Sequence, residues 1–149
     1  MAQNEITVDA PPSAVWEVLA HPETYEEWVV GNKAIRGQDP NWPAPGTEFQ
    51  HTVGFGPVAV KDKTVALESV PSKRLVMNVR ALPVGHGIVT FELSETGGGT
   101  QVRMEECPAG GPAKRIWAVL DPLTRLRNAE TLRRLRRCAE SRHGTASAS

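Results

Sequence analysis

The sequence predicts an α+β fold in which a curved antiparallel sheet wraps around a long C-terminal helix. Three observations predict it: a strand-like opening followed at once by a helix signal, a series of short strands punctuated by Gly and Pro between Lys33 and Cys107, and an Arg-rich amphipathic stretch near the C-terminus. A sheet closed by a helix encloses space, and its inward side chains then become the walls of a cavity. We therefore expect an internal site for an apolar small molecule.

The opening predicts one strand and two short helices. Residues Asn4–Asp9 alternate polar and apolar side chains at the strand period, and the prolines that follow suit the first turn of a helix. The helix over Pro11–Leu19 has a broad apolar face, and it ends at His21 because Pro22 disfavours helical angles in the residue before it. A second helix is expected over Glu23–Trp28.

Six more strands are expected, which makes an antiparallel sheet of seven. Within 74–80 and 88–94 the apolar residues alternate strictly, which predicts one buried and one solvated face. In the segment from Val58 to Leu67 the apolar parity changes, and we expect a β-bulge near Lys61–Lys63 to account for this. The six predicted strands are Lys33–Arg36, Thr47–Val53, Val58–Ser69, Arg74–Leu82, Ile88–Ser94 and Thr100–Cys107.

The C-terminal region predicts a helix in two segments. Asp121 is a good N-cap residue and Pro122 is preorganised for a first helical position, so the main helix is expected from Pro122 to about Arg142, after a short apolar helix over Ala113–Leu120. One domain over residues 1–143 and a disordered polar tail over 144–149 follow. The stripe facing the sheet should consist of Thr124, Asn128, Thr131, Leu132, Leu135 and Ala139.

Charge is distributed unevenly along a chain whose formal net charge is zero. Residues 1–111 carry eight basic and fourteen acidic side chains, whereas residues 112–149 carry nine and three. No aromatic residues interleave the basic run to stack on bases, so we expect no nucleic-acid partner. The arginines are interpreted as the solvated face of the last helix: Arg125, Arg127, Arg133, Arg134, Arg136 and Arg137.

Other classes of protein are disfavoured by what the sequence lacks. No apolar run approaches the roughly 20 residues of a membrane span, and the first residues lack a signal-peptide profile, so a soluble cytoplasmic protein is expected, as a monomer or a homodimer. Cys107 and Cys138 lack metal-ligand spacing and are interpreted as free thiols. No Gly-rich loop precedes a helix, and no metal or cofactor is predicted.

Five segments carry a family resemblance across nearly the whole chain: Ile6–Trp16, Tyr25–Trp28, Val70–Leu75, Gly97–Glu106 and Arg127–Leu135. With the order of elements, they make the chain resemble the START-like (SRPBCC) superfamily of helix-grip proteins, which includes bacterial polyketide cyclase/dehydrase proteins. The resemblance implies a polyketide-like or lipid-like hydrophobic ligand. It leaves three functions open, because fold does not decide activity: ligand binding, a polyketide cyclase, aromatase or dehydratase, and an interaction module resembling chaperone co-activators.

Two residues are candidates for acid–base chemistry. Glu106 shares a strand face with Val102 and Met104, so its carboxylate should lose hydration and its pKa should rise unless a cation or several donors face it. His51 shares a face with Phe49 and could orient a ligand carbonyl or exchange a proton with a phenol. Each residue also has a structural interpretation. Glu106 would then be solvated at the open end of its strand, and His51 would be hydrogen-bonded to a neighbouring polar group.

The remaining candidates are binding residues. Asn128 interrupts the apolar helix stripe and must either tie the helix to a backbone group or present its amide to a ligand. The resemblance places Trp28, Trp42 and Trp117 near the entrance of the cavity. The expected walls are Phe49, His51, Met77, Val79, Phe91, Met104 and Glu106.

Overall fold

A computed structural model describes residues 2–148 except 31, 56, 82–84 and 111–113. It confirms the predicted α+β class, with seven strands, two short helices after the first strand and a long last helix. The elements are β1 (Ala2–Val8), α1 (Pro12–Leu19), η1 (Pro22–Thr24), α2 (Tyr25–Trp28), β2 (Asn32–Gln38), β3 (Glu48–Phe55), β4 (Val58–Val70), β5 (Arg74–Ala81), β6 (Gly85–Thr96), β7 (Gly99–Gly110) and α3 (Lys114–Ala148).

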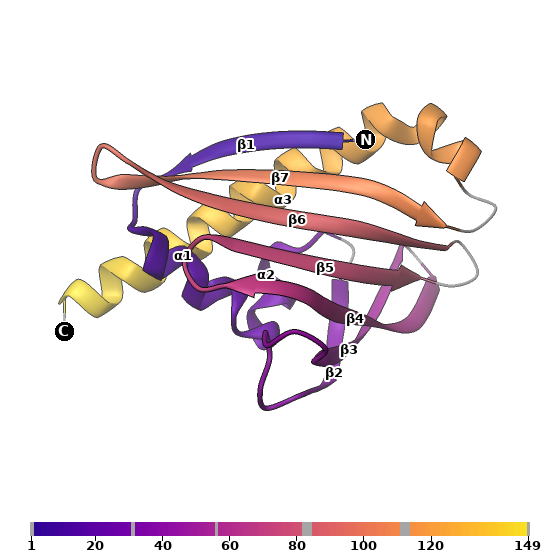
Figure 1. Cartoon of the computed structure of the whole chain (residues 1–149), viewed down its shortest axis with the longest axis horizontal. Coiled ribbons are helices and arrows are strands. Elements are labelled where there is room, and N and C mark those ends of the chain that lie inside the picture. The colour runs from indigo at the N-terminus through magenta and orange to yellow at the C-terminus, as the bar shows by residue number, and fades with distance from the viewer. Residues whose placement is uncertain (1, 31, 56, 82–84, 111–113, 149) are drawn as a thin grey trace.

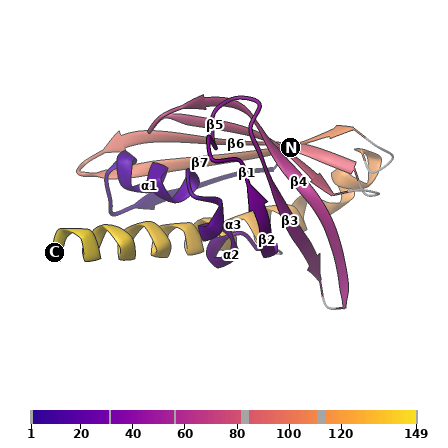
Figure 2. The ribbon, with the colours of Figure 1, turned by 90° about the horizontal axis from the view of Figure 1, so that it is seen from below.

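The strands form one antiparallel sheet in the order β1-β7-β6-β5-β4-β3-β2 (Figure 1). The sheet curves, and α1, α2 and α3 all lie on one side of it (Figure 2). Helix α3 packs against β1, β7, α1 and α2. The molecule therefore has a sheet layer and a helix layer, with the core between them.

The core follows from the strand and helix periods. Inward residues of the sheet, such as Leu75, Phe91 and Val102, belong to one buried core cluster with Leu132 and Leu135 of α3. All six residues predicted for that stripe are buried, which confirms the orientation of α3. None of the helices in the described part of the chain is both long and apolar enough to cross a membrane.

The bulge in β4 lies elsewhere than predicted. Residues Lys61–Lys63 pair regularly with β3, and the register shift falls on the β5 side between Ala66 and Glu68. The parity of Val58 and Val60 therefore continues along β4, so the polar Asp62 and Thr64 face inward and are buried. The prediction was wrong because it required the inward positions of this strand to be apolar.

The division of the last helix at Pro122 was also wrong. Helix α3 begins at Lys114 and contains Pro122 in its interior. A proline removes one helical hydrogen bond and favours a bend, and Figure 1 shows α3 bending in its orange, N-terminal part. The helix also extends to Ala148, into the tail for which the composition predicts disorder, since adding residues to an existing helix costs little.

Candidate functional site

Polar side chains are buried at two places on the inner side of the sheet. The structure places His51, Asp62 and Thr64 on β3 and β4, and Glu106 on β7 with Asn128 above it on α3. Apolar residues of β5 and β6 lie between these two groups in the sheet order. The interior therefore combines apolar surface with polar groups at opposite parts of the sheet.

His51 is a buried polar residue without a hydrogen-bond partner among the described residues. It is 2% exposed, and neither Nδ1 nor Nε2 has a hydrogen-bond partner in the described part of the chain. Its ring lies against the Phe49 ring, with centroids 5.7 Å apart. Phe49 and His51 are buried on the same face of β3, as the alternation predicts. Because buried polar groups are almost always hydrogen-bonded, an unsatisfied imidazole indicates a missing polar partner.

Burial keeps the His51 imidazole neutral. Loss of hydration lowers the pKa of His51 below its ordinary 6.5, and the Arg36 guanidinium acts in the same direction. The backbone of Lys63 and the Asp62 carboxylate oppose this lowering, without satisfying either ring nitrogen. Arg36 Nη2 donates to the carbonyl oxygens of His51 at 3.3 Å and Asp62 at 3.1 Å, so it fixes the backbone of both strands here.

Asp62 is a buried carboxylate that the sequence interpretation missed. It is the register partner of His51 on the neighbouring strand. Its Oδ1 accepts hydrogen bonds from Arg80 Nε at 2.8 Å and from the Lys63 backbone N–H at 2.9 Å. The signal was present in the parity of Val58 and Val60, which places Asp62 and Thr64 on their face.

Glu106 is held in an ion pair across the sheet–helix interface. Arg127 Nη2 lies 2.7 Å from Oε1 and 2.5 Å from Oε2 of Glu106. The sequence predicts a desolvated Glu106 carboxylate unless a cation faces it, and Arg127 is that cation. Arg127 was expected on the solvated face of the helix, and this was wrong, because a long side chain can carry its charge past its own stem to a buried partner.

Asn128 completes the same contact. Its Nδ2 lies 3.5 Å from Glu106 Oε2, and its Oδ1 accepts from Arg127 at 3.3–3.4 Å. Asn128 therefore ties α3 to β7 through side chains, whereas the structural interpretation expected a backbone partner. A contact between Asn128 and a ligand stays a prediction.

Trp28 and Trp42 lie in a buried aromatic cluster. Trp28 and Trp42 are 1% and 7% exposed, and their indole N–H groups donate to Thr24 Oγ1 and to the Leu19 carbonyl oxygen. Trp28 packs on Tyr25 and Phe91, and Trp42 packs on Phe49. Trp117 belongs to α3, but its side chain lies outside the described residues.

Tyr25 links this cluster to the sheet and was not singled out from the sequence. Its hydroxyl donates to the Leu19 carbonyl oxygen at 2.7 Å and lies 3.9 Å from Met77 Sδ. Complete burial raises the pKa of the Tyr25 phenol above its usual range. Tyr25 is therefore a neutral packing residue here.

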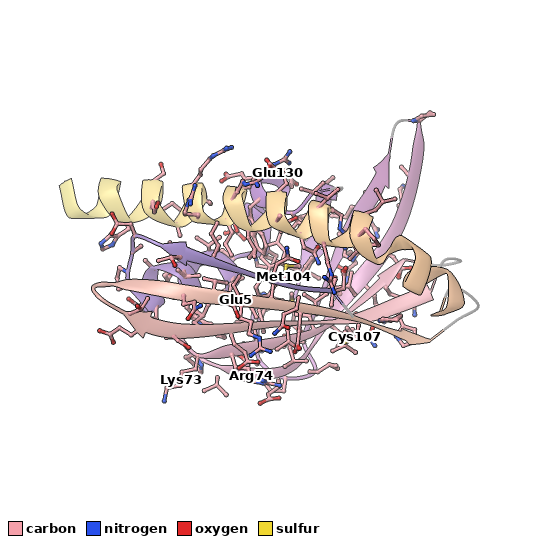
Figure 3. The ribbon with its side chains drawn as sticks, turned by 90° about the horizontal axis from the view of Figure 1, so that it is seen from above. Glu5, Lys73, Arg74, Met104, Cys107 and Glu130 are labelled. Carbon is pink, nitrogen blue, oxygen red and sulfur yellow. The ribbon has the colours of Figure 1, made fainter. Side chains whose placement is uncertain are left out.

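The predicted apolar walls face the interior. Met77, Phe91 and Met104 are buried, and Val79 is half-buried. Figure 3 shows Met104 between the strands and α3, whereas Lys73 and Arg74 lie on the opposite side of the sheet. The structure thus groups the predicted wall residues on one face, whereas their contact with a ligand stays a prediction.

A hollow lies at the surface where α2 meets the C-terminal half of α3. Its volume is about 400 Å³, and it is lined by Glu27, Arg134, Arg137, Cys138 and Ser141. Charged side chains make this hollow unsuited to an apolar ligand. Cys107 and Cys138 are both free thiols, as predicted.

The family is decided by a match that covers most of the chain. Residues 2–140 match the family described as "Polyketide cyclase / dehydrase and lipid transport". The chain belongs to this family. A search of the curated proteins gives no match.

Solved structures share the fold of this member of the polyketide cyclase/dehydrase and lipid transport family at low sequence identity. A protein from Nitrosomonas europaea is 20% identical, with 94% of each chain covered and a TM-score of 0.72. A protein from Thermus thermophilus is 12% identical, with 99% of each chain covered and a TM-score of 0.67. The di-domain ARO/CYC StfQ of the steffimycin biosynthetic pathway is 15% identical, with a TM-score of 0.75; the match covers 95% of this chain and 51% of StfQ.

Proposed function

We propose that this protein binds a hydrophobic or aromatic small molecule, polyketide-like or lipid-like, between the inner face of the sheet and α3. The observation that carries the proposal is the unpartnered, buried His51 imidazole beside apolar wall residues. A ligand with an apolar body and a polar group would supply the missing hydrogen bond. Family membership and the shared fold of StfQ support the same class of ligand.

A cyclase or dehydratase reaction would need this same binding step. The neutral His51 imidazole is the better candidate for a base, because the Glu106 carboxylate is already engaged by Arg127 and Asn128. No hydrogen bond or ion pair joins His51 to Glu106 within the described residues, so the two catalytic candidates do not form a pair. Binding is therefore common to the carrier and the enzyme alternatives.

The test is calorimetric titration of the protein with naphthol, combined with a substitution that fills the interior. Val79→Phe adds a ring at a half-buried inward position of β5, opposite Thr64 on β4. We expect saturable one-to-one binding to the unchanged protein, and an affinity about tenfold lower or worse in Val79→Phe, because a competing ring costs about 1–3 kcal/mol.

The matched control is Leu67→Phe, which makes a similar change on the outer face, where Leu67 is 47% exposed. This variant should bind naphthol with unchanged affinity. The proposal is wrong if no apolar probe binds at up to about millimolar concentration, a threshold near −4 kcal/mol, or if both variants weaken binding equally.

A further inference from the structure

The hydrogen-bonding capacity of His51 restricts the polar group that a ligand can carry. A neutral imidazole offers one N–H donor and one lone pair, and both are unpaired here. Phe49 on the same strand face supplies aromatic surface next to the ring. A bound group must therefore accept a hydrogen bond, donate one, or do both at this place, next to an aromatic wall.

The charged neighbours of His51 are already engaged. Asp62 Oδ1 is held by Arg80 and by the Lys63 N–H, and Arg36 donates to two backbone carbonyl oxygens. The two act on the imidazole with opposite sign. An ionised ligand group at this place would therefore have to compete with the hydrogen bonds that these side chains already make.

The cation at the other end of the interior is engaged as well. Arg127 Nη2 is shared by both Glu106 oxygens and by Asn128 Oδ1. An ionised carboxylate entering the interior would lose its hydration without gaining a cation of its own, and burying an unpaired charge is costly. It would also offer the lone pair of His51 no donor.

We propose that His51 selects ligands whose polar group is an uncharged hydroxyl, or a hydroxyl next to a carbonyl as in a phenol or enol, over ligands that carry a carboxylate. This inference rests on the proposed function and makes it more specific. Phenols and enolised ketones are the favoured ligand class, and free fatty acids are disfavoured. A hydroxyl fits either nitrogen, because it both donates and accepts.

The experiment compares three probes of nearly equal apolar size: naphthol, naphthoate and naphthalene. At neutral pH, we expect calorimetry to give naphthol an affinity about tenfold above naphthalene, which is the size of one well-formed hydrogen bond, and naphthoate the weakest binding. His51→Phe removes both nitrogens and keeps an aromatic ring. It should bind naphthol and naphthalene equally.

Two further variants make the result specific to His51. His51→Gln retains one donor group and one acceptor, and it should keep part of the preference for naphthol. His86→Phe is the matched control, because His86 is a half-buried histidine whose Nδ1 contacts Asn78 Oδ1, and its loss should leave all three affinities unchanged.

A pH series on the unchanged protein needs no variant. Burial lowers the pKa of His51, so the imidazole is neutral at neutral pH and gains its proton only on acidification. The imidazolium has two donors and no lone pair, so acidification should shift the preference from naphthol toward naphthoate.

The outcomes separate the two claims. If none of the three probes binds, the proposed function fails. If the probes bind but naphthoate is preferred at neutral pH, or His51→Phe keeps the preference for naphthol, the inference is overturned while the proposed function stands. A preference for naphthol that disappears in His51→Phe alone supports both.

Discussion

At the scale of single residues, His51 and Glu106 show how different environments give two buried polar groups different roles. Glu106 is paired at short distance with Arg127, so it stabilises the contact between β7 and α3. His51 has no partner for either nitrogen in the described residues. A satisfied buried ion serves the fold, whereas an unsatisfied buried imidazole is available to a ligand.

Removing the guanidinium of Arg127 should destabilise the fold. Arg127→Met keeps most of the side-chain stem but leaves the Glu106 carboxylate buried without its cation. We expect the free energy of unfolding to fall by about 3 kcal/mol, the low end for a broken buried pair, because Arg127 is one-third exposed. Urea denaturation measures this change.

The control for Arg127→Met is Arg133→Met on the same helix. Arg133 is 57% exposed and, within the part of the chain that the structure describes, pairs with Glu130 at 3.4 Å, so its loss should change stability by less than about 1 kcal/mol. Adding Glu106→Gln to Arg127→Met should recover part of the loss. Equal effects of the two arginine substitutions would contradict the role given to the ion pair.

At the scale of elements, α3 stabilises the fold through one stripe. Leu132 and Leu135 are fully buried against the sheet, whereas Leu123 and Leu126 are exposed near the start of the helix. The 3.6-residue period identified this stripe from sequence, because burial repeats with the helical turn.

Substitution of leucines by alanine on α3 should distinguish its buried face from its exposed face. Leu132→Ala creates a cavity in the core and should lower the free energy of unfolding by about 3 kcal/mol. Leu126→Ala, at a position that is 69% exposed, should change it by no more than about 0.5 kcal/mol. Comparable losses in the two variants, measured by denaturant unfolding, would show that α3 packs in another orientation.

The elements that sequence could predict are those with a clear period. Strict alternation identified β5 and β6, and the strand period also placed Phe49 and His51 on one inward face of β3. The start of α3 could not be found this way, because Pro122 is as compatible with a bend inside a helix as with a first turn.

Across the whole molecule, the fold joins Glu106 on β7 to Arg127 and Asn128 on α3, whereas it keeps Glu106 and His51 apart. His51 on β3 lies in the same sheet as Glu106, but three strands separate them. The burial of Asp62 and the contact of Arg127 with Glu106 were not predicted from sequence, for a physical reason. Patterns of hydrophobicity treat charged residues as exposed, whereas a charge can be buried when a partner from another element meets it.

The central claim is that the space between the sheet and α3 receives an apolar ligand. Met77 on β5 and Met104 on β7 are both buried on the inner face. NMR of methyl-labelled methionine during a naphthol titration can therefore detect a ligand there. We expect saturable shifts of the Met77 and Met104 methyl resonances, since a bound aromatic ring shifts the methyl groups next to it. Unchanged Met77 and Met104 resonances at saturating naphthol would show that no ligand binds between the sheet and α3.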